Sequence, residues 1–243
     1  MSRFLQLESL SRLRKQTAFL GFLGASLMLI GDLLLYGNFG DIPSTQPWVT
    51  EFLPARSPLL LADSLALNAS TLLGPIAAML YVGGSVHPFL IFERRKFVGF
   101  FVAIASAAAF IGSGAYHAQF GIVGHVARHA NNLLQSPASL LESVETTLQV
   151  LNTFVQIAWL FAFSALFVGI LTGSTQLPRR FAWISPLLPI AVLIPLVESR
   201  AVDWPSPWSG IAAGGIYNFL MALCFLAFLV ASRSREHLTS KVR

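Results

Sequence analysis

The sequence predicts an all-α integral membrane protein, a single bundle of six transmembrane helices. Of its 243 residues, 55% are hydrophobic and only 11% are charged, whereas a soluble globular domain carries about 25% charged residues. The mean hydropathy is +0.67. Six apolar runs also approach or exceed the roughly 20 residues that a helix needs to cross a bilayer. Because backbone polar groups in lipid must be paired within the segment, these runs are predicted to be helices.

The six predicted spans form one membrane domain, residues 17–231. They lie near 17–37, 65–92, 97–118, 148–173, 181–198 and 209–231. Residues 1–16 precede this domain as a basic segment whose apolar residues recur at helical spacing, as in a helix at the membrane interface. Residues 232–243 follow it as a basic tail.

The distribution of basic residues predicts the orientation. Most of the 16 Lys and Arg residues fall in the N-terminal segment, the turns after the second and fourth spans, and the C-terminal tail. By the positive-inside rule both termini are expected in the cytoplasm, as in a multi-pass protein of a bacterial inner (plasma) membrane. The sequence pI of about 9.9 follows from this topology, so we expect the lipid bilayer as a partner and no nucleic acid.

An aspartate lies inside the first apolar run. A carboxylate in hydrocarbon costs about 2.5–3.5 kcal/mol even on mild insertion scales, so Asp32 must face a protein interior, a partner or a water-filled cavity. Gly24, Met28, Asp32 and Tyr36 follow one another at steps of four and share one helix face. Asp32 is therefore predicted to be a functional residue.

The other intramembrane polar residues, with the exception of His87, gather in the same, outer half of the predicted spans. This one-sided distribution predicts an outward-facing polar cavity for a lipid-like or small amphipathic ligand. Acid–base chemistry is predicted for Asp32, His117 and Glu198, because a carboxylate and an imidazole can exchange a proton near neutrality. The residues predicted to bind the ligand are Tyr36, Asn68, Ser113, Tyr116, Asn152, Gln156 and Asn218. Alternatively, these groups form interhelical hydrogen bonds worth about 0.6 kcal/mol each.

Two histidines follow the third span in His125-Val-Ala-Arg-His129. On a helix this spacing places both imidazoles on one face, where they could hold a divalent metal such as zinc. The alternative is a solvated loop helix, and no other cofactor is expected. Gly121 and Gly124 are expected to interrupt any helix that continues from the third span. The roles of Asp63, near a span boundary, and of His87, in the inner half of the second span, stay open.

Two resemblances add to this interpretation. The segments Gly31-Asp32-Leu33-Leu34-Leu35-Tyr36-Gly37 and Gly114-Ala115-Tyr116-His117 resemble those of an uncharacterised family of small bacterial multi-pass membrane proteins, which implies the same bundle and no function. Gly31-Asp32 and Asp63-Ser64-Leu65 are locally similar to the two aspartate motifs of lysoplasmalogenase-like membrane hydrolases. In that family the motifs are well separated, whereas here they are close in sequence.

Three functions are consistent with these observations. The first is a membrane-embedded hydrolase or isomerase of a lipid, with Asp32 as base or metal ligand and His117 as its acid–base partner. The second is a small proton-coupled transporter in which Asp32 binds a proton or cation. The third is a non-catalytic membrane component that binds a partner protein, in which the polar residues hold helices together. The sequence leaves open whether the protein is an enzyme, and which oligomeric state it adopts.

Overall fold

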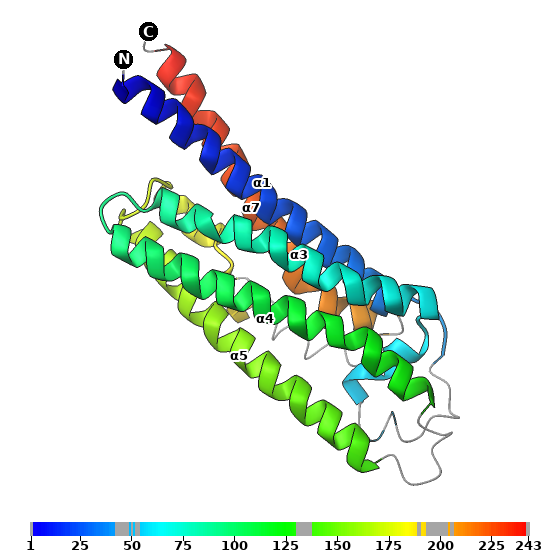
Figure 1. Ribbon diagram of the computed structural model, residues 1–243. Helices are drawn as coiled ribbons and strands as arrows, with labels where there is room; N and C mark the ends of the chain where they lie inside the picture. Colours follow the sequence, from blue (N-terminus) through cyan, green and yellow to red (C-terminus); the bar gives the residue numbers. More distant parts are fainter. Residues whose placement is uncertain are drawn as a thin grey trace.

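The computed structural model describes residues 2–41, 49, 51, 54–129, 138–188, 191–192, 204 and 207–241. The elements of this part of the chain are helical (Figure 1). The long helices are α1 (Ser2–Tyr36), α3 (Ser64–Ile91), α4 (Lys96–His129), α5 (Ala138–Leu171) and α7 (Trp208–Lys241), and the 3-10 helices are η1 (Pro54–Leu60) and η3 (Arg179–Ile184).

Five helices within the described residues are long and apolar enough to cross a membrane. The prediction of an all-α, multi-pass membrane bundle is confirmed. The predicted fifth span, 181–198, begins in η3, and its second half lies mostly outside the described residues.

The long helices lie side by side along one common direction (Figure 1). α3 packs between α1 and α4, α7 packs against α1, and α5 packs against the other side of α4. Both chain termini lie at the end that also holds the α3–α4 turn, and we call this the terminal end. The opposite end, with η1, the start of α3 and the end of α4, is called the distal end.

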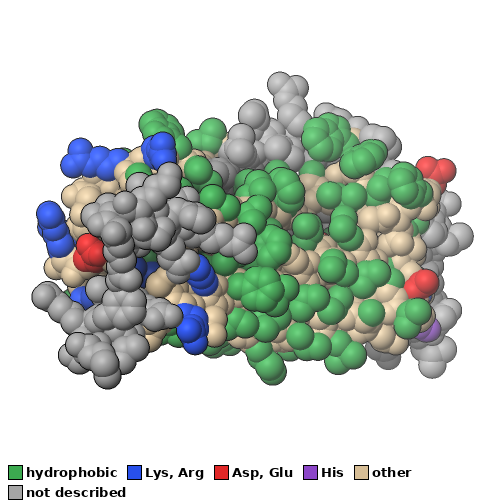
Figure 2. All heavy atoms as spheres, turned by 90° about the horizontal axis from the view of Figure 1, so that it is seen from above, with side chains coloured by type: hydrophobic (Ala, Val, Ile, Leu, Met, Phe, Trp, Pro, Cys, Tyr) green, Lys and Arg blue, Asp and Glu red, His purple; other side chains and the backbone are tan. Residues whose placement is uncertain are grey.

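The surface has the pattern expected of a membrane-spanning bundle. In Figure 2, hydrophobic side chains cover the middle of the visible face, Lys and Arg gather at one end together with an acidic side chain, and further acidic side chains and a histidine lie at the other end. Many large apolar side chains are exposed, among them Met79, Ile111 and Ile157. Lipid is the medium in which such exposure is stable.

α4 and α5 extend further at the distal end than the predicted spans. The expectation that Gly121 and Gly124 interrupt the helix is wrong, because α4 continues unbroken to His129. These glycines serve packing: a Cβ on Gly121 would lie 1.7 Å from Thr71 Oγ1, and one on Gly124 would lie 2.5 Å from Leu67 Cδ2. Small residues of this kind let membrane helices approach closely. At the N-terminus, α1 is one helix from Ser2, without a break between residues 16 and 17.

Two buried apolar clusters fill the bundle. The larger contains Met28, Tyr81, Phe110 and Phe225, and the rings of Tyr81 and Phe110 stack with centroids 4.2 Å apart. The smaller cluster, at the distal end, contains residues such as Leu35, Leu59, Leu67, Phe120 and Leu148. Along α1, α3 and α4, the stretch between the two clusters holds buried polar side chains, and these form the candidate site.

The turns at the terminal end are joined by backbone hydrogen bonds. Phe92 and Thr175 form an isolated antiparallel bridge. The amide of Glu93 donates to the Ser174 carbonyl (3.2 Å), and the amide of Gln176 donates to the Ile91 carbonyl (2.9 Å). The bridge therefore ties the α3–α4 turn to the segment after α5.

Candidate functional site

Asp32 and His117 meet in the interior of the bundle. His117 Nε2 lies 3.1 Å from Asp32 Oδ1, although the two residues are 85 positions apart in the chain. Each residue is only 3% exposed. The pair predicted from the sequence as acid–base partners is thus brought into direct contact between α1 and α4.

Two further side chains complete a network around the carboxylate. Asn218 Nδ2 donates to Asp32 Oδ2 at 2.8 Å, and the Tyr81 hydroxyl donates to Asn218 Oδ1 at 3.0 Å. Both oxygens of Asp32 are therefore within hydrogen-bonding distance of side chains of other helices. The network connects α1, α3, α4 and α7.

Glycines on two helices form a narrow slot for the His117 ring. A Cβ on Gly31 would lie 2.6 Å from His117 Cε1, and one on Gly74 would lie 3.1 Å from His117 Nδ1. On the same side of α1, Ser70 Oγ donates to the Gly31 carbonyl at 3.2 Å. The backbone of α1 and α3 thus encloses the imidazole, and the position of the ring is fixed by packing as well as by its hydrogen bond.

The second nitrogen of the imidazole makes no hydrogen bond with Asp32. His117 Nδ1 is buried without a hydrogen-bond partner in the described part of the structure. Buried polar atoms are usually paired, so such an atom calls for an explanation. Its closest surroundings include the backbone of Gly74. Asp32 and His117 are closed off in this conformation, and a ligand would reach them only after neighbouring groups move.

An arginine and aromatic rings cover the distal side of the pair. Arg56 of η1 donates from Nη2 to the Tyr116 hydroxyl at 2.6 Å, and its guanidinium carbon lies 4.9 Å from the Phe120 ring centroid. Phe120 in turn contacts His117 and Tyr36, with ring centroids 5.9 Å and 6.0 Å apart. Tyr36 and Tyr116, both predicted to bind a ligand, therefore belong to this layer.

Arg56 is a half-buried cation, with 16% of its side chain exposed, that the sequence analysis did not select. Burial opposes its charge, but the neighbouring Tyr36 and Tyr116 hydroxyls and the Glu145 carboxylate outweigh this effect and raise the pKa of Arg56 above its ordinary value. Glu145 Oε2 lies 4.0 Å from Arg56 Nε. Arg56 therefore keeps its positive charge at physiological pH, next to the aromatic cover of the pair.

The remaining predicted ligand-binding residues lie further from Asp32. Ser113 is half-buried on α4, one turn before His117. Asn152 is half-buried and Gln156 is exposed on α5, which packs mainly against α4. Asn68 is exposed near the distal end of α3. Glu198, the third predicted acid–base residue, lies outside the described residues.

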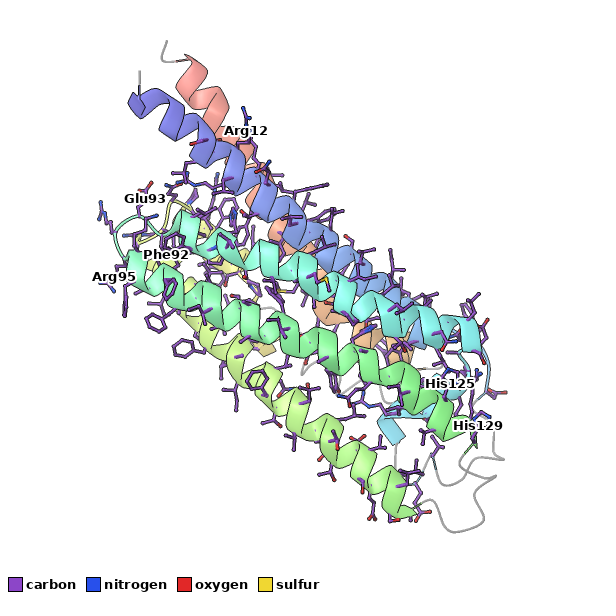
Figure 3. All side chains as sticks on the ribbon, viewed as in Figure 1. Arg12, Phe92, Glu93, Arg95, His125 and His129 are labelled. Carbon is purple, nitrogen blue, oxygen red and sulfur yellow. The ribbon has the colours of Figure 1, made fainter. Side chains whose placement is uncertain are left out.

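His125 and His129 lie at the distal end of α4 (Figure 3). His125 Nε2 is 3.0 Å from Asn68 Oδ1, and His129 Nδ1 is 2.9 Å from the His125 carbonyl. In the parts of the chain that the structure describes, no group of three or more His, Cys, Asp or Glu residues could hold a metal ion. A metal bound there would therefore have at most two ligands of these four residue types among the described residues.

The two residues left open by the sequence have definite surroundings. Asp63 is exposed and caps α3, accepting from the Ala66 amide at 2.7 Å. His87 is 1% exposed, and its Nδ1 lies 3.1 Å from the Arg14 carbonyl and 3.2 Å from Thr17 Oγ1. Its ring stacks on Phe228 with centroids 4.8 Å apart. His87 thus joins α1, α3 and α7 in the half of the bundle nearer the termini.

Comparison with known proteins adds one finding. Residues 9–234 match the model of DUF6796, a family of unknown function. The chain belongs to this family. The match covers most of the chain, which confirms the predicted resemblance to an uncharacterised family. Among curated proteins and among solved structures, nothing matches the chain.

Proposed function

We propose that this integral membrane protein is a proton-coupled carrier of a small amphipathic or lipid-like molecule, with the Asp32–His117 pair as its proton-binding site. The observation that carries this proposal is that both oxygens of a buried carboxylate bond to side chains of other helices, and that one of these partners is itself titratable. The proposal places the protein in a bacterial inner membrane with both termini in the cytoplasm.

The energetic reason is the cost of charge in a low-dielectric interior. A lone carboxylate at this depth costs about 2.5–3.5 kcal/mol, and a proton on His117 would neutralise it. Loss of that proton leaves the network negatively charged, so α1 would pack differently against α4 and α7. The titratable groups that face the pair are Tyr36 on α1, Tyr81 on α3 and Tyr116 on α4, with Arg56 beyond the aromatic layer.

The test is a pH-dependent distance between α1 and α4. Spin labels on cysteines at Ile30 and Ile111, which are 48% and 58% exposed, would report this distance in proteoliposomes between about pH 5 and pH 8 by electron-electron double resonance. We expect the distance distribution to change with pH in the otherwise native chain and to stay constant in Asp32→Asn. Asp63→Asn, which changes an exposed helix cap, is the matched control and should retain the change.

A constant distance in the native chain, or a pH response that survives in Asp32→Asn, contradicts the proposal. The network would then be a static contact between helices. That outcome supports the third function, a non-catalytic component that binds a partner protein.

A membrane-embedded lipid hydrolase or isomerase is the second candidate, and one specific observation favours it. Asp32 holds Nε2 of His117 while Nδ1 has no partner among the described residues. In acid–base dyads a carboxylate fixes the imidazole in this way so that the other nitrogen can accept a proton from the reacting group. A substrate would have to displace the layer formed by Phe120 and Arg56.

Turnover of fluorescent phospholipid and lysophospholipid by the purified protein tests this candidate. Loss of turnover in His117→Asn, with turnover retained in the exposed-end variant His125→Asn, would support it. Turnover that persists in His117→Asn, or no turnover of either lipid by the native chain, would contradict it.

A further inference from the structure

A groove at the terminal end lies apart from the Asp32 network. It has a volume of about 570 Å³ and is lined mainly by apolar side chains of α4 and α5, among them Val98, Ile157, Phe161 and Val168. Phe92 and Arg95 of the α3–α4 turn line it as well (Figure 3).

The buried wall of the groove is fixed by close packing. Phe92 is fully buried, and a Cβ on Gly169 would lie 2.4 Å from its Cζ. The side chains on the α5 side are open to the surroundings: Ile157 is 65% and Phe161 is 60% exposed. A rigid apolar depression with an exposed rim is therefore present before any ligand binds, so little ordering would oppose binding.

The groove is long enough to extend through the hydrocarbon of one lipid leaflet. Its lining residues extend along α5 from Ile157 to Gly169 and include Thr172 just after the helix. At 1.5 Å per residue this stretch is about 22 Å long, compared with a hydrocarbon half-thickness of about 15 Å. A hydrocarbon chain lying along it would reach the membrane surface at the α3–α4 turn.

Cations surround the point where that chain would reach the surface. Arg95 lines the groove, and its neighbours Arg94 and Lys96 are exposed. Arg179 and Arg180 are also exposed, in the segment that the Phe92–Thr175 bridge ties to this turn. The one acidic residue of the turn, Glu93, accepts a hydrogen bond from Gln176. The charge at this end of the groove therefore suits a negatively charged headgroup.

We propose that the groove binds one acyl chain of an anionic phospholipid, with the lipid phosphate at Arg95. The site is independent of the function proposed for Asp32. The apolar wall supplies affinity for the chain, and the arginine supplies preference for negative charge. Each basic residue near a membrane surface contributes about fivefold to the affinity for anionic lipid.

The experiment is native mass spectrometry of the detergent-purified protein, titrated with phosphatidylglycerol or phosphatidylcholine carrying identical acyl chains. We expect tighter binding of phosphatidylglycerol. Arg95→Gln should reduce that binding about fivefold and should reduce phosphatidylcholine binding less, because the choline of that lipid offsets the charge of its phosphate. Arg12→Gln removes the same charge at the same end of the molecule, on α1, and should have little effect.

A second pair of variants tests the acyl chain. Val168→Trp, at a position that is 52% exposed, would fill the groove and should weaken binding of both lipids. Val150→Trp, on α5 but outside the groove and 68% exposed, is its control. Free glycerol phosphate should not displace the lipid, because it lacks the chain.

Four results would overturn the proposal. Equal binding of the two lipids would remove the role of charge, and equal loss in Arg95→Gln and Arg12→Gln would indicate a general surface effect. Unchanged binding in Val168→Trp would place the lipid elsewhere. Displacement by glycerol phosphate would indicate a headgroup site without an acyl-chain site.

Discussion

Replacement of Gly31 by alanine tests whether the position of His117 depends on the glycine slot. The new methyl group would lie 2.6 Å from His117 Cε1, whereas carbon atoms in contact are about 3.5–4.0 Å apart. The ring would have to move by about 1 Å, and the present 3.1 Å separation from Asp32 would then exceed hydrogen-bonding distance. No polar group is removed, so the effect comes from geometry alone.

The expected cost has two parts. Overpacking of a close-packed site typically costs about 1–3 kcal/mol, and an interhelical hydrogen bond in a membrane contributes about 0.6 kcal/mol. Alanine also gains up to about 1 kcal/mol of helix propensity over glycine. A net loss of about 1.6 kcal/mol, or about fifteenfold in the unfolding equilibrium, is therefore expected from the middle of the overpacking range.

Gly215→Ala provides the matched control. Gly215 lies on α7, and its added Cβ would be 3.3 Å from Leu29 Cδ1 and 3.9 Å from Asp32 Cβ. The gain in helix propensity is the same, but the contacts are near the ordinary range. The assay is the free energy of unfolding in mixed detergent micelles titrated with dodecyl sulfate. Equal stability of the two variants would refute the reasoning, because it would show that His117 can shift without cost.

Three further predictions follow from the same contacts. Tyr81→Phe should lower the free energy of unfolding by about 0.6 kcal/mol, the value of one interhelical hydrogen bond; a loss above 2 kcal/mol in the same titration would mean that the hydroxyl does more than bond to Asn218. Gly114→Leu should separate α3 from α4, because even a Cβ there would be 2.4 Å from Ala78 Cβ; it should lower the thermal stability in detergent, and an unchanged melting temperature would contradict the close approach. Arg56→Gln should destabilise the packing of Arg56 against Tyr116 and Phe120 by about 1–2 kcal/mol, because a charged hydrogen bond and a cation–π contact are lost. Hydrogen exchange at the distal end of α4 should then become faster. Unchanged exchange would argue against a covering role for Arg56.

Helical periodicity predicted the buried face of α1 correctly. Gly24, Met28, Asp32 and Tyr36 are all buried in the bundle. Spacing along one helix determines which residues share a face, and the high cost of a charge in lipid determines which face turns inward. The prediction that Asp32 faces the interior of the bundle therefore needed only the sequence of its own helix.

The sequence narrowed the set of candidate hydrogen-bond partners for Asp32 but did not identify which of them contact it. His117 and Asn218 were candidates because of their depth, yet spacing does not determine which faces of different helices meet. Tyr81 was missed, although a tyrosine at mid-span, away from the interfaces where tyrosines usually lie, was an available signal. No pattern in the sequence around Arg56 indicated its role, because its contact with Tyr116 joins positions 60 residues apart.

Helix ends were the least predictable part of the fold. Gly121 and Gly124 would be weak points of a helix in water, where glycine favours the unfolded chain. In this bundle they allow α4 to approach Leu67 and Thr71 of α3, and the close contact keeps the helix continuous. The decisive quantity was the fit between two helices, which the sequence of one helix does not contain.

The bridge between Phe92 and Thr175 has a consequence for biogenesis. Its two hydrogen bonds join the α3–α4 turn to residues that follow α5 in the chain, so they can form only after α4 and α5 have both been inserted. Protection of the Glu93 and Gln176 amides against solvent exchange would therefore arise late during synthesis. Protection of these two amides would indicate that the first four transmembrane helices have assembled.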